Sequence, residues 1–484
     1  MAEFVYLRSG NVKMEKMMEQ QQLKKCPIGI QTFEEIINKG YLYIDKTEYV
    51  YRMAHGASKY CFLSRPRRFG KSLLTSTLHS YFAGKKDLFR GLAIEKLETE
   101  WTEYPVLHLD LNIGKYDQPD SLDKILNEAL LGWETLYGTR IGEDTLALRF
   151  KGVVNRAYKQ TGHPVVILVD EYDKPMLQAI GNEELQREYR NTLKPFYGVL
   201  KTMDGCIKFA MLTGVTKFGK VSVFSDLNNL EDLSMWNEYV PLCGITDKEL
   251  HETLEAEMHE FAEAQRLTDE QFRNKLREYY DGYHFTHNSV GLYNPFSLLN
   301  AFKRKEFGSY WFETGTPTYL VELLKKHRYN LERMADEETD AQVLHSIDSE
   351  STNPIPVIYQ SGYLTIKGYD ERFGIYRLGF PNREVEEGFV RFLLPFYANT
   401  NKVDAPFEIQ NFVREVETGN YDAFFRRLQS FFADTPYELV RDLELHYQNV
   451  LFIVFKLMGF YTKVEYHTSE GRVDLVLQTN KYIY

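Results

Sequence analysis

The sequence lacks the features that mark several common classes of protein. Its 484 residues include only four cysteines, widely spaced and without a C-x-x-C pair, so we expect buried free thiols in a reducing cytosol and neither a disulfide framework nor a zinc site. The run Leu451–Met458 is too short and too charged to cross a membrane, and no secretory signal is visible. We therefore expect a cytoplasmic protein without a membrane partner.

An excess of positive charge is also missing. The net charge of −11 argues against general electrostatic binding to nucleic acid, although a local basic groove remains compatible with it. What the sequence does have is an ordinary 43% of hydrophobic residues and a high 14% of aromatic ones, which indicates well-filled cores. The length suffices for two or three domains.

A phosphate-binding loop is predicted where the apolar run Lys59–Leu63 ends. The following segment cannot continue a strand, because Pro66 lacks an N–H group. From Lys71 onward the apolar residues follow helical spacing, so a Gly-Lys-Ser step opens a helix. Helix N-termini carry unpaired N–H groups that suit phosphate. Lys71 would reach the β- and γ-phosphates, and the Ser72 hydroxyl would bind Mg²⁺.

This loop departs from the usual pattern G-x-x-x-x-G-K-[ST], because its first glycine falls on Arg65. One interpretation is that the backbone wraps the phosphates differently and that nearby arginines add charge to the site. The alternative is a basic surface turn before an ordinary helix, and the loop alone leaves both open. Under the first interpretation, the nucleotide is bound by Arg65, Arg67, Arg68, Phe69, Gly70, Lys71 and Ser72, together with Asp170.

An acidic pair follows the apolar run Val165–Val169, which is typical of a strand buried on both faces of a parallel sheet. Asp170 would lie at the carboxyl edge, where open α/β sheets bind ligands, and would hold Mg²⁺ through water and Ser72. Glu171 would polarise the attacking water as a general base. An acidic strand exit that merely caps the next helix is the alternative. The loop and the acidic pair together favour a nucleoside triphosphatase.

Further strands are expected at residues 104–110 and 207–213, with helices near 121–137 and 182–202. This alternation predicts an α/β fold with a parallel sheet and helices on both faces. An additional strand between the phosphate loop and the acidic strand is typical of triphosphatases with a catalytic glutamate. Thr213 would end one strand, where it could sense the γ-phosphate or play no part.

At these residues the chain resembles the bacterial AAA-ATPase-like family that carries a PD-(D/E)xK nuclease-like domain at its C-terminus. The resemblance extends from about Pro27 to the end of the chain. Its marks are Pro27–Ile30 with Phe33, Tyr43–Thr47, Arg65–Ser72, Val169–Asp173, Thr213–Phe218, Tyr280–Tyr283, Tyr293–Ser297 and Trp311–Gly315.

The resemblance implies that the arginine-rich loop takes the place of the missing glycine. It further implies that Lys71 and Ser72 bind nucleotide, Asp170 binds Mg²⁺ and Glu171 is the catalytic acid/base. We expect four regions, which are a flexible leader over 1–24, a P-loop ATPase domain over 25–245, a helical lid or linker over 246–380, and a nuclease-like domain over 381–484.

The last region is expected to form a helix near 437–458 and strands at 461–466 and 471–477. By resemblance, Asp474 is a metal ligand and Glu444 a further one; the alternative for Asp474 is an exposed strand aspartate. The strand with the (D/E)-x-K pair would come next, and the sequence stops at Tyr484. We therefore expect a nuclease-like domain that lacks its last strands, and no nuclease activity from this chain.

Three functions are compatible with these motifs. The first is Mg²⁺-dependent binding and hydrolysis of ATP, with ATP preferred to GTP because no suitably placed N-K-x-D occurs. The second is a nucleotide-gated switch with little or no hydrolysis. The third is an ATP-regulated nuclease in a longer chain, with nucleic acid as the partner of the C-terminal domain. A homo-oligomer is left open, because no arginine that would act across an interface stands out.

Overall fold

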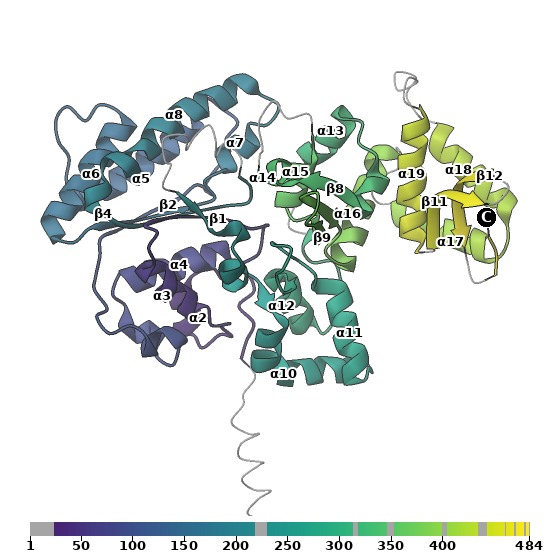
Figure 1. Cartoon of the computed structure of the whole chain (residues 1–484), viewed down its shortest axis with the longest axis horizontal. Coiled ribbons are helices and arrows are strands. Elements are labelled where there is room, and N and C mark those ends of the chain that lie inside the picture. The colour runs from purple at the N-terminus through teal and green to yellow at the C-terminus, as the bar shows by residue number, and fades with distance from the viewer. Residues whose placement is uncertain are drawn as a thin grey trace, which may run out of the picture.

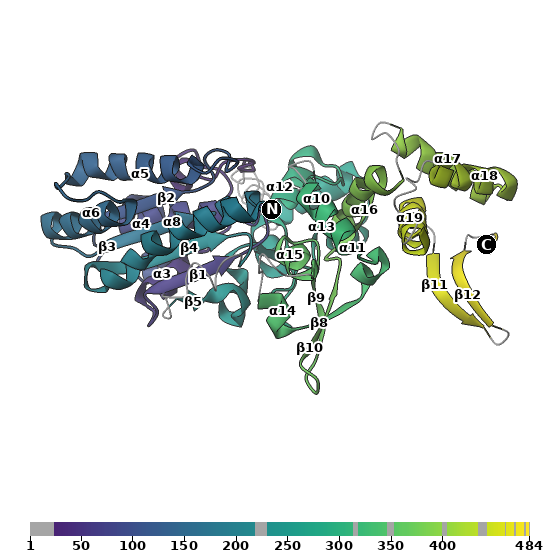
Figure 2. The same ribbon diagram turned by 90° about the horizontal axis from the view of Figure 1, so that it is seen from above.

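The computed structural model describes residues 24–217, 230–312, 318–345, 353–398, 404–433, 443–459, 461–468, 471–478 and 481–483. Three parts follow one another along its longest axis: a large sheet with its helices, a mixed middle region, and a C-terminal group of helices with a strand pair (Figure 2). The expected leader lies outside the described residues except for residue 24. The expected domain limits remain predictions.

A five-stranded parallel sheet forms the first part, which confirms the predicted fold class. Its strands are β1 (Tyr60–Ser64), β2 (Val106–Asp110), β3 (Val165–Asp170), β4 (Ile207–Gly214) and β5 (Glu231–Asp232), in the order β2-β3-β4-β1-β5. In space β4 lies between β1 and β3, whereas β2, which separates the two motifs in sequence, is at the edge. The register pairs Leu63 with Thr213 and Asp110 with Asp170, so the carboxyl ends meet at one edge.

Helices cover both faces of this sheet (Figure 1). One face carries α2 (Phe33–Asn38), α3 (Thr47–His55) and α4 (Lys71–Phe82), and the other carries α5 (Ser121–Tyr137), α6 (Leu146–Thr161), α7 (Lys174–Gln178) and α8 (Glu183–Thr202). Short 3₁₀ helices are η1 (Lys86–Phe89), η2 (Ala93–Lys96), η3 (Asp204–Cys206), η4 (Leu233–Met235) and η5 (Asn237–Leu242). β1, β3 and most of β4 are fully buried, as strands between two helical layers must be.

The middle region begins with helices α10 (Asp247–Ala264), α11 (Asp269–Tyr280) and α12 (Pro295–Arg304), joined to the sheet part by the short pair β6 (Ile245–Thr246) and β7 (Leu292–Tyr293). A capping box in which the side chains of Thr246 and Glu249 bond each other's backbone N–H starts α10. Helical spacing buries Leu250, Phe261 and Phe272 in a core of their own. The sequence predicts helices over Asp247–Arg266 and Thr268–Tyr280 and a capping box at Thr246–Glu249, and the structure confirms all three.

A small antiparallel sheet completes the middle region, with η7 (Leu331–Ala335), α13 (Thr318–Lys326), α14 (Ala341–His345) and α15 (Ile355–Gln360) around it. Its order is β8 (Glu337–Asp340), β10 (Ile375–Gly379), β9 (Thr365–Asp370). The sequence also predicts short strands around residues 359–366, but the structure places the strand later in the chain. Tyr359 and Gln360 end α15, whose first turn accepts Pro356 because no N–H is needed there, and the strand begins only at Thr365.

The C-terminal part contains α16 (Arg383–Tyr397), α17 (Ala405–Glu417), α18 (Tyr421–Ala433) and α19 (Leu443–Met458), followed by the antiparallel pair β11 (Tyr461–Thr468) and β12 (Gly471–Gln478). The helix expected near 437–458 and both expected strands are present in the described residues. No helix in the described part of the chain combines the length and apolar character that crossing a membrane requires.

The four cysteines differ in burial. Cys61 on β1 and Cys243 are buried, whereas Cys26 and Cys206 are partly exposed, so the expected burial holds for two of them. Burial raises the pKa of the Cys61 thiol to about 12, which keeps it protonated at neutral pH.

Candidate functional site

The loop between β1 and α4 takes its shape from two residues in the left-handed region. Gly70 has a φ of 95° and immediately precedes α4, while Arg68 has a φ of 66°. A Cβ on Gly70 would meet nothing within 4 Å, so glycine is favoured there by its backbone angle rather than by lack of space. A non-glycine residue at positive φ costs on the order of 1–3 kcal/mol and is often found at ligand sites.

Lys71 joins the loop to the acidic pair. Its ammonium group is buried and donates to the carbonyl oxygens of Arg65 at 3.1 Å and Pro66 at 3.3 Å. The same Nζ lies 3.3 Å from Oε1 of Glu171. The structure therefore brings together the two halves of the site that lie 100 residues apart in the sequence.

The acidic pair stands at the end of β3. Asp170 is buried, and its carboxylate accepts a hydrogen bond from the Thr213 hydroxyl on β4. Glu171 has a φ of 54°, a strained angle that turns the chain out of the strand. Its carboxylate is partly exposed and lines the adjacent pocket.

A pocket of about 780 Å³ opens above these residues. Its polar lining includes Gly70, Lys71, Ser72 and Glu171, together with arginines 67 and 68. Its apolar lining includes Ile28, Ile30, Pro295, Phe296 and Leu299. The Arg68 guanidinium lies 4.9 Å from the centre of the Phe296 ring. A ligand with both charged and apolar groups fits this lining.

Four residues predicted for the site are not among those that line this pocket. The guanidinium of Arg65 is buried and donates to the carbonyl oxygens of Ser64 and Ser234, at 3.0 and 2.8 Å, and of Tyr239 at 3.3 Å. Burial lowers its pKa to about 10, so it stays charged at neutral pH. The structure thus places Arg65 in the core, where backbone carbonyls accept hydrogen bonds from its Nη1 and Nη2 groups, and its role as a phosphate ligand stays a prediction.

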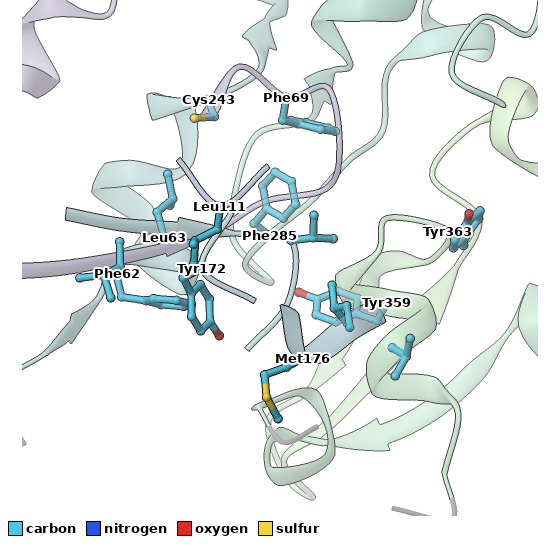
Figure 3. Close-up of a cluster of buried hydrophobic side chains, with 14 of the residues drawn as sticks. Phe62, Leu63, Phe69, Leu111, Tyr172, Met176, Cys243, Phe285, Tyr359 and Tyr363 are labelled. Atoms are coloured by element: carbon cyan, nitrogen blue, oxygen red, sulfur yellow. The ribbon is translucent and has the colours of Figure 1, made fainter. Parts of the chain in front are cut away.

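Phe69, Asp170 and Thr213 are the other three. Phe69 is buried, and its ring centre lies 4.8 Å from that of Tyr283. The Phe285 ring, labelled beside Phe69 in Figure 3, has its centre 5.5 Å away. Thr213 is fully buried and contacts Asp170, so its hydroxyl supports the carboxylate rather than facing the pocket.

Residues of the middle region hold the phosphate loop from outside. The indole N–H of Trp311 donates to the carbonyl oxygen of Arg67 at 3.1 Å. Gly362, with a φ of 90°, packs so closely on Pro66 that an added Cβ would lie 2.6 Å from the proline Cβ. We call Tyr283, Phe285, Trp311 and Gly362 the loop clamp. Apart from the resemblance at Tyr283 and Trp311, nothing in the sequence signalled these long-range contacts.

The residues predicted to hold Mg²⁺ are Ser72, which lines the pocket, and Asp170, which is buried at the end of β3 and is not among the lining residues. No cluster of three or more histidine, cysteine or acidic side chains suited to a metal occurs in the described residues. Mg²⁺ commonly uses one or two carboxylates and completes its shell with water and substrate phosphates, so the chemistry of Ser72 and Asp170 is compatible with Mg²⁺, and their role stays a prediction. Glu444 and Asp474 lie on α19 and β12, but their side chains are outside the described part.

Comparison with known proteins agrees with this arrangement. A family described as "Predicted AAA-ATPase" matches residues 27–224, and one described as "PD-(D/E)XK nuclease superfamily" matches residues 442–484. An uncharacterized protein in the vnfD 5' region of Azotobacter chroococcum mcd 1 is 36% identical over 480 residues, which cover 95% of this chain and 88% of that protein. With its phosphate loop and acidic strand end side by side, the chain belongs to the predicted AAA-ATPase family and carries a PD-(D/E)XK nuclease superfamily segment at its C-terminal side.

Proposed function

We propose that this chain binds ATP with Mg²⁺ and hydrolyses the γ-phosphate. The observation that carries the proposal is the 3.3 Å approach of Lys71 Nζ to Glu171 Oε1 in a pocket that also holds Gly70 and Ser72. A buried cation at the first residue of α4, beside a candidate base at the end of β3, suits phosphoryl transfer to water.

Each residue has a separate role in this proposal. The N-terminus of α4 and the Lys71 ammonium bind the β- and γ-phosphates, and this requires Lys71 to exchange its present carbonyl partners for phosphate oxygens. Ser72 and Asp170 would hold Mg²⁺, which neutralises phosphate charge when bound. Glu171 orients the attacking water and accepts its proton as the bond from the γ-phosphorus to the leaving ADP oxygen breaks.

The apolar residues of the pocket account for the base. A purine placed between the Ile28–Ile30 segment and Phe296 would stack on the Phe296 ring, and the Arg68 guanidinium now 4.9 Å from the ring centre would have to give way to it or lie on the other face of the ring. Base stacking on an aromatic side chain contributes about 1–3 kcal/mol. We therefore expect Phe296→Ala to raise KM for ATP about tenfold and to leave kcat within about twofold. Phe296→Tyr keeps the aromatic ring, so its KM and kcat for ATP should match those of the parent. An equal rise in KM in both variants would mean that the base binds elsewhere.

The first experiment is phosphate release from ATP by the purified chain, with GTP as competitor and with EDTA in a parallel sample. We expect release with Mg²⁺, loss of release on chelation, and a preference for ATP. Failure of the chain to bind ATP would refute the proposal. Binding without release would instead favour a nucleotide-gated switch.

The switch is a second candidate because residues of the middle region contact both the phosphate loop and the segment that follows β4. The loop clamp contacts Pro66 and Arg67, and the Lys217 N–H donates to Gln360 Oε1 on α15 at 2.6 Å. A change in the loop on ATP binding would thus reach residues far from the nucleotide. The match at 442–484 supports a third candidate, a nuclease-like module directed at nucleic acid under the same control.

A further inference from the structure

Asp173 is a fully buried acid that the pocket does not use directly. Its carboxylate accepts hydrogen bonds from the Val215 N–H at 3.2 Å, the Thr216 N–H at 2.6 Å and the Thr216 hydroxyl at 2.7 Å. Burial, and then the charge of Glu171, raise its pKa to about 6. A buried carboxylate is costly without partners, and here the strand exit after β4 supplies three.

The position of Asp173 suggests an ordinary helix cap, but its side chain does not act as one. It is the residue before α7, yet its carboxylate makes no hydrogen bond to the first N–H groups of that helix. The carboxylate is directed instead to the chain that leaves β4. Its partners are thus on a different element from the one it would cap.

Neighbouring contacts join the turn Glu171–Asp173 to the segment Thr213–Thr216, where the chain leaves β4. We call this set of contacts the joint. The Tyr172 N–H donates to the Thr213 carbonyl at 2.9 Å, and the Tyr172 hydroxyl donates to the Thr216 carbonyl at 2.9 Å. Gly214 lies between them, since an added Cβ would be 2.6 Å from both Asp173 Oδ1 and the Tyr172 ring. In Figure 3 the Tyr172 ring also packs beside Phe62 of β1, with ring centres 5.3 Å apart.

Glu171 depends on this joint for its orientation. Its φ of 54° is disfavoured for a residue with a side chain, and such angles persist only where the surroundings fix them. Asp173 and Tyr172 immediately follow it and are anchored on Thr213–Thr216. The anchoring thus holds the strained turn that places the Glu171 carboxylate at the pocket, 3.3 Å from Lys71.

We infer that Asp173 is a positioning residue for hydrolysis: by accepting hydrogen bonds from Val215 and Thr216 it fixes the turn that aims Glu171 into the nucleotide pocket. The catalytic part of this inference rests on the proposed function. The structural part, that the Thr216 hydroxyl holds the turn that contains Glu171, rests on geometry alone.

Thr216→Val removes the hydroxyl and keeps the shape, while Thr216→Ser keeps the hydroxyl. We expect Thr216→Val to lower kcat about tenfold with KM for ATP within about twofold, because small misplacements of a catalytic group slow chemistry more than binding. Thr216→Ser should stay within about twofold of the parent in both. Asp173→Asn keeps the shape of the acid and should repeat the kcat loss, which provides a second variant if the first fails to fold.

Amide hydrogen exchange of the same proteins distinguishes a failure of this inference from a failure of the proposed function. Thr216→Val should speed exchange of the Glu171–Asp173 amides and leave the phosphate loop unchanged. Unchanged kcat and unchanged exchange in Thr216→Val and Asp173→Asn would overturn the inference. A parent chain without ATP turnover would overturn the proposed function and the catalytic purpose of Asp173, whereas exchange would then still show whether the hydroxyl holds the turn.

Discussion

The Glu171→Gln variant is expected to bind ATP with the affinity of the parent chain and to hydrolyse it about 100-fold more slowly or worse. Glutamine keeps the size of the side chain, and its amide oxygen can still face Lys71 Nζ. It cannot accept a proton from water, so only the chemical step suffers. Phosphate release under saturating ATP, together with a binding titration, measures the two effects separately.

Glu134→Gln is the matched control for this variant. Like Glu171, Glu134 on α5 is a carboxylate paired with a cation, here Arg149 at 2.7 and 2.8 Å, but Glu134 is buried and does not line the pocket. Its loss should lower stability and leave turnover per folded molecule within about twofold. If Glu171→Gln hydrolysed ATP at the parental rate, Glu171 would not be the base.

The Lys71→Ala variant is expected to weaken ATP binding about 10- to 100-fold, because a hydrogen bond to a charged group contributes about 1.5–3 kcal/mol. Removing the ammonium also leaves the Glu171 carboxylate without its cation beside the incoming phosphates. Repulsion between the two negative groups would add to the loss. Binding of ATP by the purified variants, measured by calorimetry, tests this result.

Lys46→Ala provides the control, because Lys46 is another lysine with a carboxylate partner, and its side chain is only 11% exposed. Its ammonium pairs with Glu249 at 2.5 and 2.7 Å, next to the cap of α10 and outside the nucleotide pocket. Breaking this pair should destabilise the chain by about 3 kcal/mol and leave ATP affinity unchanged. An equal loss of affinity in both variants would mean that Lys71 acts through folding alone.

The elements with strong local patterns are those that the sequence predicted well. The five-residue apolar run before Asp170 forms β3, and α5 spans Ser121–Tyr137 as expected. The segment around Tyr359 was misplaced because its apolar residues suit a buried helix as well as a strand, and the chain around it decides between them.

The candidate site was predictable where it depends on motifs and unpredictable where it depends on distant contacts. The meeting of Lys71 and Glu171 follows from two motifs at the carboxyl edge of one sheet. The burial of Arg65 does not, because its partner Ser234 lies 169 residues away and offers only a backbone carbonyl. The sequence assigns no role to Asp173 for the same reason, since the residues that donate hydrogen bonds to its carboxylate follow another strand, β4.

The loop clamp has a consequence for how the protein is made. Trp311 holds Arg67 across 244 residues of sequence, so the ribosome completes the phosphate loop about 10 to 50 seconds before it completes the clamp. During that interval the nascent sheet domain carries Pro66 and Arg67 without their outer support, and the pocket lacks the wall that α12 provides. Under the proposed function, competence for ATP is therefore expected late in synthesis, and an incomplete chain emerging from the ribosome would not yet consume nucleotide.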